Sequence, residues 1–284
     1  LLEFAPSSLY PVTHHSHFLA AKAILFNALS SGITALGEHI CGHPKSSFSI
    51  EDYREFVRTI PMDISFAATS ISIGFDQLAH FTSVTGSKPV RKEDLIDSTI
   101  VTKMAIQNDF PGENLFINAT PANFTADEVP RAGEVIYTEK ELKRIVKIFH
   151  QLKQQIGVHV AGDSEIKMAL RAGVDVLHHA HGISDQVIKE VQESGASVVA
   201  TPMGGTHLKP NSPKEIVKMI QHNIRVSIAT DAYLPPYPEA EWLPFTDQKL
   251  RGPEILMQIA NPAMTLMKVH GYDDNEILAL ITRN

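Results

Sequence analysis

Apolar residues recur at helical spacing and at strand spacing in turn along the second half of the chain. In residues 142–156 they stand three or four positions apart, which predicts an amphipathic helix. The short apolar stretch at 157–161 follows at once and predicts a buried strand. The same alternation predicts helices at 163–172, 184–194 and 212–223, and strands at 174–179, 196–201 and 224–231. Strands and helices that alternate in this way are typical of βα repeats around a parallel sheet.

The first half of the chain follows the same rhythm less regularly. Strands are predicted at 9–17, 33–38, 62–68 and 114–119, helices at 18–31 and 92–107, and longer loops at 69–90 and 119–137. Eight predicted strands with intervening helices in 284 residues favour an α/β fold, a (βα)8 TIM-like barrel of parallel strands that forms one domain over 1–284. A doubly wound open sheet is the alternative, but no glycine-rich nucleotide-binding motif follows the first strand.

The composition narrows the function classes. A net charge of −7 and a pI near 6.0 provide no basic surface for nucleic acid or for an anionic membrane. No apolar run is long enough to span a bilayer, and residues 1–11 lack the basic flank of a signal peptide. Cys41 is the only cysteine, so no internal disulfide can form. We therefore expect a cytoplasmic protein that acts on a small molecule.

Histidines gather where the strands are predicted to end. In a barrel of parallel strands the carboxyl ends of the strands carry the chemistry. The residues of ligand type at these ends are His15, His17, His159, His178, His179 and Asp231. Any one buried histidine is as readily a satisfied core residue as a ligand. Imidazoles and a carboxylate at four strand ends together predict a site for zinc or a similar divalent ion.

Through these residues the chain resembles the amidohydrolase superfamily, and within it the imidazolonepropionase-like and cyclic-amide-hydrolysing branch. The pair His15 and His17 matches the family's His-x-His on strand 1, and Asp231 matches its strand-8 aspartate. His159 and His179 match its histidines on strands 5 and 6, within the stretch GVHVAGDSEIKMALRAGVDVLHH. The resemblance implies that these five residues form the metal site and that Asp231 is the catalytic proton shuttle.

The sequence also departs from the family pattern. Thr13 stands where members usually have an aspartate, and the fourth strand offers Asn118 in place of a bridging lysine or glutamate, which argues for a single metal ion. The glutamate that deaminases carry shortly after the strand-5 histidine is missing after His159. The small β-sandwich domain that flanks the barrel in many members is expected to be absent or truncated.

The resemblance therefore implies a metal-dependent hydrolase that uses a metal-activated water to cleave a C–N bond in an amide or cyclic amide, other than an ordinary peptide bond. The implied cofactor is one divalent ion, with zinc favoured over iron, manganese or nickel. Two alternatives stay open: an aminohydrolase (deaminase) on the same scaffold, and a non-catalytic metal-binding relative. Asp231 favours the enzyme, because a purely structural metal has no use for a base.

Three further residues are candidates for substrate binding: Asn118, His181 and His207. Each also has an ordinary interpretation, a hydrogen bond to a loop or contact with solvent. His39 ends the second strand and is a candidate to orient a ligating imidazole. The sequence leaves open whether His178 or His179 faces the metal. Many members of the family are homo-oligomers, and the number of subunits is open here.

Overall fold

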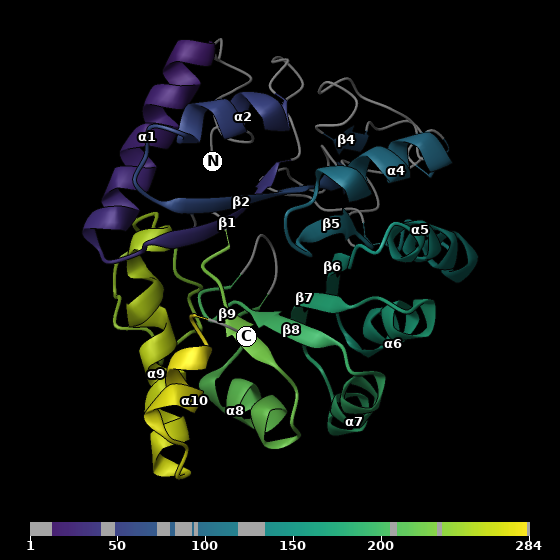
Figure 1. The fold of residues 1–284 in the computed structure, drawn as a ribbon. Coiled ribbons are helices and arrows are strands. Elements are labelled where there is room, and N and C mark those ends of the chain that lie inside the picture. Colours follow the sequence, from purple (N-terminus) through teal and green to yellow (C-terminus); the bar gives the residue numbers. More distant parts are fainter. Residues whose placement is uncertain are drawn as a thin grey trace.

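A computed structural model describes residues 13–40, 49–72, 80–82, 93, 96–118, 134–204, 209–231 and 235–282 (Figure 1). The strands are β1 (Ala35–Ile40), β2 (Asp63–Ala68), β3 (Ser70–Ser72), β4 (His80–Thr82), β5 (Glu113–Phe116), β6 (Gly157–Ala161), β7 (Val176–His181), β8 (Ser197–Ala200) and β9 (Val226–Ile228). The helices are α1 (His14–Ser30), α2 (Ile50–Val57), α4 (Ser98–Gln107), α5 (Glu139–Gln151), α6 (Asp163–Ala172), α7 (Asp185–Ser194), α8 (Pro213–Gln221), α9 (Leu256–Val269) and α10 (Asp274–Ala279), with a 3-10 turn η3 (Pro253–Ile255).

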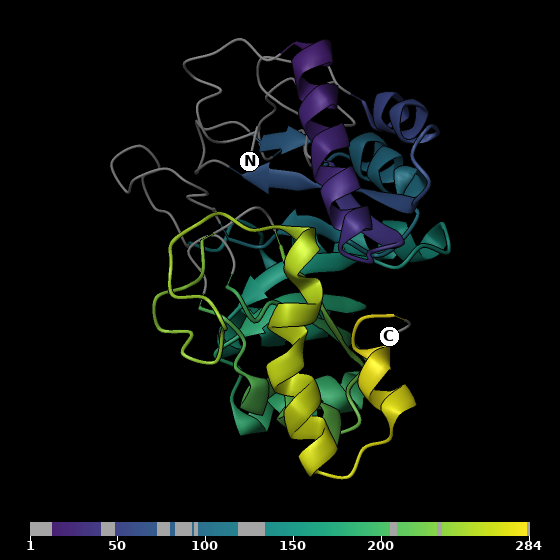
Figure 2. The same cartoon turned by 90° about the vertical axis from the view of Figure 1, so that its left-hand side faces the viewer.

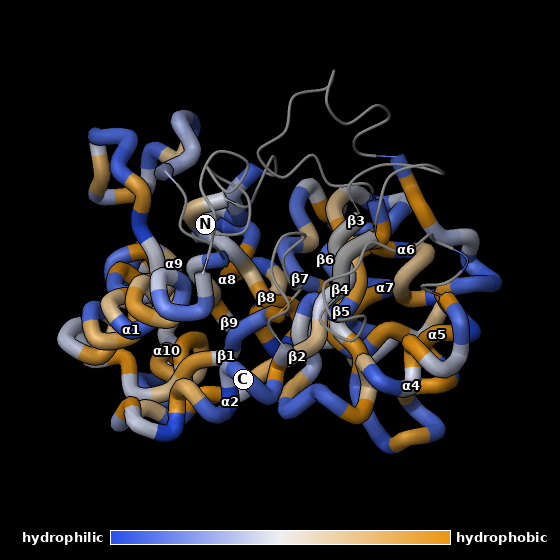
Figure 3. Tube along the Cα trace, turned by 90° about the horizontal axis from the view of Figure 1, so that it is seen from above, coloured by the Kyte–Doolittle hydropathy of each residue, from blue (hydrophilic) through white to orange (hydrophobic). Residues whose placement is uncertain are grey.

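The strands form two sheets. Strands β1 and β2 pair in parallel, and a second sheet has the order β4-β3-β5-β6-β7-β8-β9. Every pairing from β3 through β5 to β9 is parallel, whereas β3 and β4 pair antiparallel. Seen from above, the strands lie in the middle with helices such as α1, α5, α7 and α9 outside them (Figure 3). The α/β fold with parallel strands that the sequence predicts is therefore confirmed.

The ladder of strands does not close into a ring among the described residues. Side chains take the place of a ladder between β2 and β5: the backbone N–H of Phe66 donates to Asp109 Oδ2 at 2.9 Å, and that of Ala68 donates to Asn108 Oδ1 at 3.0 Å. Asn114 Nδ2 donates in return to the Ala68 carbonyl at 2.8 Å. At the other end of the larger sheet, the Ile228 N–H of β9 donates to the Leu280 carbonyl at 2.8 Å.

Helices cover the outside of the larger sheet because each presents one apolar stripe to it. In α5, Leu142, Ile145, Val146 and Phe149 are buried, while the charged residues Lys143, Arg144 and Lys147 lie between them and are exposed. Capping boxes fix where α5 and α8 begin, with Thr138 and Ser212 as the N-cap residues. Helices α1 and α9 lie on the same side of the molecule (Figure 2). No helix among the described residues is long and apolar enough to cross a membrane.

The prediction of a strand at 9–17 is wrong for the part of that range that the structure describes. Helix α1 begins at His14, so His14, His15 and His17 lie in a helical first turn instead of alternating across a strand. Thr13 is the N-cap: its side chain accepts from the Ser16 N–H at 3.1 Å, and Ser16 Oγ accepts from the Thr13 N–H at 3.1 Å. This reciprocal pair satisfies two backbone donors and favours the helix one turn earlier than the apolar pattern indicates.

The remaining strands agree well with the sequence, with one addition. The described part of the predicted loop 69–90 contains β3 and β4, with Ser70 paired to Thr82. The hairpin extends the larger sheet beyond β5 and makes β4 its end strand.

Candidate metal centre

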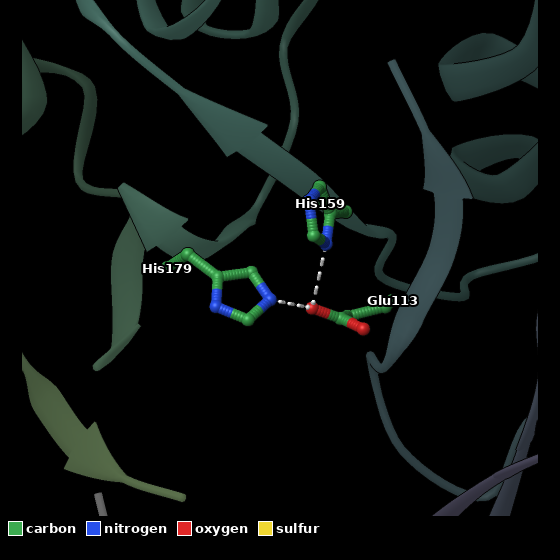
Figure 4. Close-up of side chains that lie close together, drawn as sticks. All are labelled: Glu113, His159 and His179. Carbon is green, nitrogen blue, oxygen red and sulfur yellow. Dashed lines mark ion pairs between the residues drawn. The ribbon is translucent and has the colours of Figure 1, made fainter. Parts of the chain in front are cut away.

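Three buried side chains from adjacent strands meet in the larger sheet: Glu113 of β5, His159 of β6 and His179 of β7 (Figure 4). Glu113 Oε1 lies 2.6 Å from His179 Nε2 and 3.4 Å from His159 Nδ1. The ring centroids of His159 and His179 are 4.4 Å apart. Among the described residues this is the one group of three or more such side chains whose ligand atoms all lie within 4.8 Å of one another.

The register of the strands and a bulge bring these side chains together. Glu113 pairs with Gly157, and His159 pairs with His178. The register then shifts, because Val160 pairs with His179 and Ala161 with His181, which leaves Ala180 as the extra residue of a bulge. His179 and Ala180 both have positive φ, 70° and 50°. Non-glycine residues rarely adopt this conformation, and strain of this kind is concentrated at functional sites.

Further imidazoles surround the same carboxylate. His39 Nε2 accepts the Glu113 backbone N–H at 3.2 Å, so the proton of a neutral His39 ring sits on Nδ1, which lies 4.0 Å from Glu113 Oε2. His178 Nδ1 lies 3.9 Å from Glu113 Oε1, and its ring meets that of His39 edge to face at 5.5 Å. Both His178 and His179 therefore lie near Glu113, and of the two only His179 belongs to the compact group of ligand atoms.

Glycines allow this close approach of strands and rings. A Cβ on Gly157 would collide with the Gly112 carbonyl oxygen and lie 2.8 Å from His178 Nε2. A Cβ on Gly112 would lie 2.6 Å from the His39 ring and from Ala67 Cβ. The backbone next to Glu113 is thus packed directly against the rings that face its carboxylate.

The buried charges influence one another strongly. Burial alone would raise the pKa of Glu113, but the imidazoles of His179 and His159 hold it well below 4.5. Burial would lower the pKa of His179, yet the charge of Glu113, its hydrogen bond and the charge of Asp231 raise it above 6.5. Burial lowers the pKa of His159 to about 4, of His178 to about 3 and of His181 to about 2. The ion pair of His179 and Glu113 therefore favours the charged form of each group.

The donor set suits a divalent ion such as zinc. Two imidazole nitrogens and one carboxylate oxygen are ligands that zinc prefers, and all three side chains are buried. Tetrahedral ligands about 2.0–2.1 Å from one ion lie roughly 3.3 Å apart, which matches the His159–Glu113 distance of 3.4 Å. The 2.6 Å contact of His179 with Glu113 is an ion pair, and the two ligand atoms would have to move apart to hold an ion. Thr201 Oγ1, 2.9 Å from His179 Nδ1, is placed to orient that ring.

The structure divides the ligands expected from the sequence into two groups. His159 and His179 belong to the cluster, and Asp231 is close enough to raise the pKa of His179. His15 and His17 lie on α1: His15 is exposed, and His17 Nε2 is hydrogen-bonded to the Tyr53 hydroxyl at 2.8 Å. The structure does not bring these two histidines into the cluster.

The candidate substrate-binding residues also differ in position. His181 ends β7 and is buried beside His179, with ring centroids 5.2 Å apart. Asn118 follows β5 and bridges to Val135. His207 lies outside the described residues. The catalytic candidate Asp231 has a φ of 57°, so it too stands in the left-handed conformation at the end of its strand segment.

Glu113 is the residue that the sequence analysis missed. The fourth predicted strand, 114–119, offers Asn118, whereas the carboxylate of the cluster comes from Glu113, one residue before that range and the first residue of β5. The available signal was a glutamate two residues before the apolar stretch Leu115–Ile117, where an acidic residue is buried only if it is paired.

Searches with protein-family models and with the sequences of curated proteins return no match. Solved structures do match. An amidohydrolase is 16% identical over 95% of this chain and 67% of its own length, with a TM-score of 0.62. A Xaa-Pro dipeptidase with bound methionine in its active site is 14% identical over 97% of this chain and 69% of its own, with a TM-score of 0.63. The chain has the amidohydrolase fold. This confirms, at the level of the fold, the resemblance that the sequence motifs indicate.

A third structure of the amidohydrolase fold contains a metal. It is a variant of atrazine chlorohydrolase from Arthrobacter aurescens TC1 complexed with zinc and atraton, 13% identical over 94% of this chain, with a TM-score of 0.55. This chain spans 58% of the length of that protein, and about two thirds of the other two.

Proposed function

We propose that this protein is a metal-dependent hydrolase of the amidohydrolase superfamily that cleaves a C–N bond in an amide or cyclic amide. The observation that carries the proposal is the buried group of Glu113, His159 and His179 at adjacent strands of an amidohydrolase fold. A carboxylate and two imidazoles are seldom buried together without a ligand, because their desolvation is costly. A structural role would not need the strained backbone at His179 and Ala180.

In the proposed site, Glu113 Oε1, His159 Nδ1 and His179 Nε2 hold one divalent ion, with zinc as the favoured identity. When bound, such an ion supplies a nucleophilic water near neutral pH and polarises the carbonyl of the substrate. The protein supplies the orientation. Thr201 fixes the ring of His179 through Nδ1, and the ring of Phe116 stacks on that of His159 with centroids 4.2 Å apart.

Asp231 is proposed as the group that moves the proton. Its charge is one of the causes that raise the pKa of His179, which supports a position near the proposed ion site. It would take a proton from the attacking water and deliver it to the leaving nitrogen. A cyclic amide is the favoured substrate class on the basis of the sequence resemblance. The match to a Xaa-Pro dipeptidase keeps dipeptide-like amides as the second class to be screened.

The proposal is tested by the metal content of protein purified without chelator. We expect about one equivalent of a divalent ion in the wild type and less than a tenth of that in Glu113→Gln and in His159→Ala. His150→Ala is the matched control, since His150 also pairs with a carboxylate, Asp175 at 2.9 Å, but on the surface. The control should retain the ion. Wild-type protein that neither contains nor takes up a divalent ion contradicts the proposal.

The same measurement addresses the two histidines on α1. We expect the double variant His15→Ala/His17→Ala to keep its ion, because His15 is exposed and His17 is hydrogen-bonded to Tyr53.

The substrate class is tested by screening the activity of the wild type with hydantoin, dihydrouracil and Xaa-Pro dipeptides. Release of ammonia from heterocyclic amines, without hydrolysis of any amide, would favour the deaminase alternative.

A further inference from the structure

His181 is a buried imidazole without an apparent structural role. Its relative exposure is 6%, and neither of its ring nitrogens has a hydrogen-bond partner among the described residues. Buried polar groups in proteins are nearly always satisfied, because an unpaired donor or acceptor loses its bonds to water without compensation. A leucine at this position would avoid that cost.

The ring of His181 belongs to the cluster by position. It lies nearly parallel to the ring of His179, at an interplanar angle of 26° and a centroid distance of 5.2 Å. The backbone holds it there: the Gly162 N–H donates to the His181 carbonyl at 2.8 Å, and the bulge at Ala180 sets the offset between the two histidines. His181 also interacts electrostatically with His159 and Glu113.

His181 is nevertheless not among the ligands. The compact group of ligand atoms contains Glu113, His159 and His179, and His181 is outside it in the described structure. A polar ring that lies beside an ion site but outside the ligand group is in a position to contact whatever binds to the ion. A neutral imidazole offers one N–H donor there.

We propose that His181 donates a hydrogen bond to the carbonyl oxygen of the substrate, and that this bond strengthens as negative charge develops on that oxygen during hydrolysis. This role rests on the proposed function, since it requires an ion that brings the carbonyl next to the ring. In this proposal His181 polarises the carbonyl group of the substrate, while Glu113, His159 and His179 bind the metal ion.

The test uses cobalt-loaded protein and acetohydroxamate, a small ligand that binds metal ions through its oxygen atoms. His181→Leu removes both ring nitrogens at similar volume, and His181→Gln keeps an N–H donor. We expect both variants to hold as much cobalt as the wild type. Acetohydroxamate, followed through the cobalt absorption bands, should bind His181→Leu at least about tenfold more weakly, and His181→Gln should recover most of the loss.

A second readout needs neither metal nor ligand. Removing an unsatisfied buried ring should raise the melting temperature of metal-free His181→Leu by about 2–4 °C. Unchanged acetohydroxamate affinity in His181→Leu would refute the role, and loss of cobalt in that variant would make His181 a metal ligand instead. Wild-type protein that binds no cobalt overturns the proposed function itself, and the role of His181 with it.

Discussion

Glu113 keeps its negative charge in the interior because four imidazoles face its carboxylate or backbone. His39, His159, His178 and His179 come from three strands, and no lysine or arginine of the described residues pairs with Glu113. An imidazole can give up its proton to make room for a metal ion at neutral pH, whereas a guanidinium cannot. The site is therefore suited to release one proton when it binds one divalent ion. A salt bridge between Glu113 and a lysine or arginine would not be suited to this exchange.

At the residue scale, the first prediction concerns Asp231. Changing it to asparagine keeps the size of the side chain but removes the carboxylate that is proposed to transfer the proton. We expect kcat to fall by about 10²–10⁴-fold while the metal content stays unchanged. Steady-state kinetics on the best substrate, with elemental analysis of the same sample, checks this. An active Asp231→Asn enzyme would rule out the proton shuttle.

Sequence alone identified part of the candidate site for a clear reason. His159 and His179 interrupt otherwise apolar strands, so they stand out as polar groups in buried positions. Glu113 does not stand out, because it lies just before the apolar stretch that predicts the strand at 114–119 and resembles a residue of the preceding loop. Its position in the cluster depends on the register between β5 and β6, which is a tertiary feature that no local pattern encodes.

At the scale of elements, the close contact between β5 and β6 leads to a second prediction. Gly157→Ala places a methyl group against the Gly112 backbone and the His178 ring, so the strands must move apart. We expect a loss of about 1–3 kcal/mol in the free energy of unfolding and weaker metal binding, because Glu113 adjoins Gly112. Urea denaturation and metal titration measure the two effects.

Gly37→Ala is the matched control for this change. Its new methyl group would face the tip of the Phe110 side chain, at 2.8 Å, instead of backbone. A side chain can turn aside, so the loss of stability should be smaller. Equal losses of unfolding free energy in Gly157→Ala and Gly37→Ala would mean that the contact of Gly157 with the Gly112 backbone does not determine the effect.

The elements themselves were predicted better than their ends. Strongly periodic segments such as α5 and α7 lie where the apolar pattern places them, because burial of one face fixes both the pattern and the helix. Helix α1 begins earlier than predicted, because the capping pair of Thr13 and Ser16 determines the start and the apolar pattern does not. The hairpin of β3 and β4 lies in a range without strand periodicity.

At the scale of the whole molecule, acidification should destabilise the metal-free protein below pH 6.5. Burial lowers the pKa of His39, His159, His178 and His181 below the value of 6.5 that applies to the unfolded chain. The unfolded state therefore binds more protons than the folded state, and folding stability falls as the pH drops. Each of these histidines contributes up to about 1.4 kcal/mol per pH unit in this range.

Two groups of the cluster modify this dependence. The raised pKa of His179 contributes stability that is fully present below pH 6.5 and is lost as the pH rises through the pKa of His179 in the folded state. The pH dependence of this contribution is opposite in sign to that of the other four histidines. The lowered pKa of Glu113 gives stability that is lost only well below pH 4.5. Urea denaturation of chelator-treated protein at pH 7.5, 6.0 and 5.0 measures the sum. A free energy of unfolding that does not fall across this range contradicts the prediction.

The bond from Ile228 to Leu280 has a consequence for how the molecule avoids aggregation. Among the described residues, strand β9 ends the larger sheet, and an end strand with free N–H groups can recruit a strand from another molecule. Because β9 has only three residues and its Ile228 N–H is already bonded to the segment after α10, little of this edge is left to template intermolecular pairing. The bond to Leu280 therefore leaves fewer free N–H groups on the described edge of β9 for pairing with another molecule.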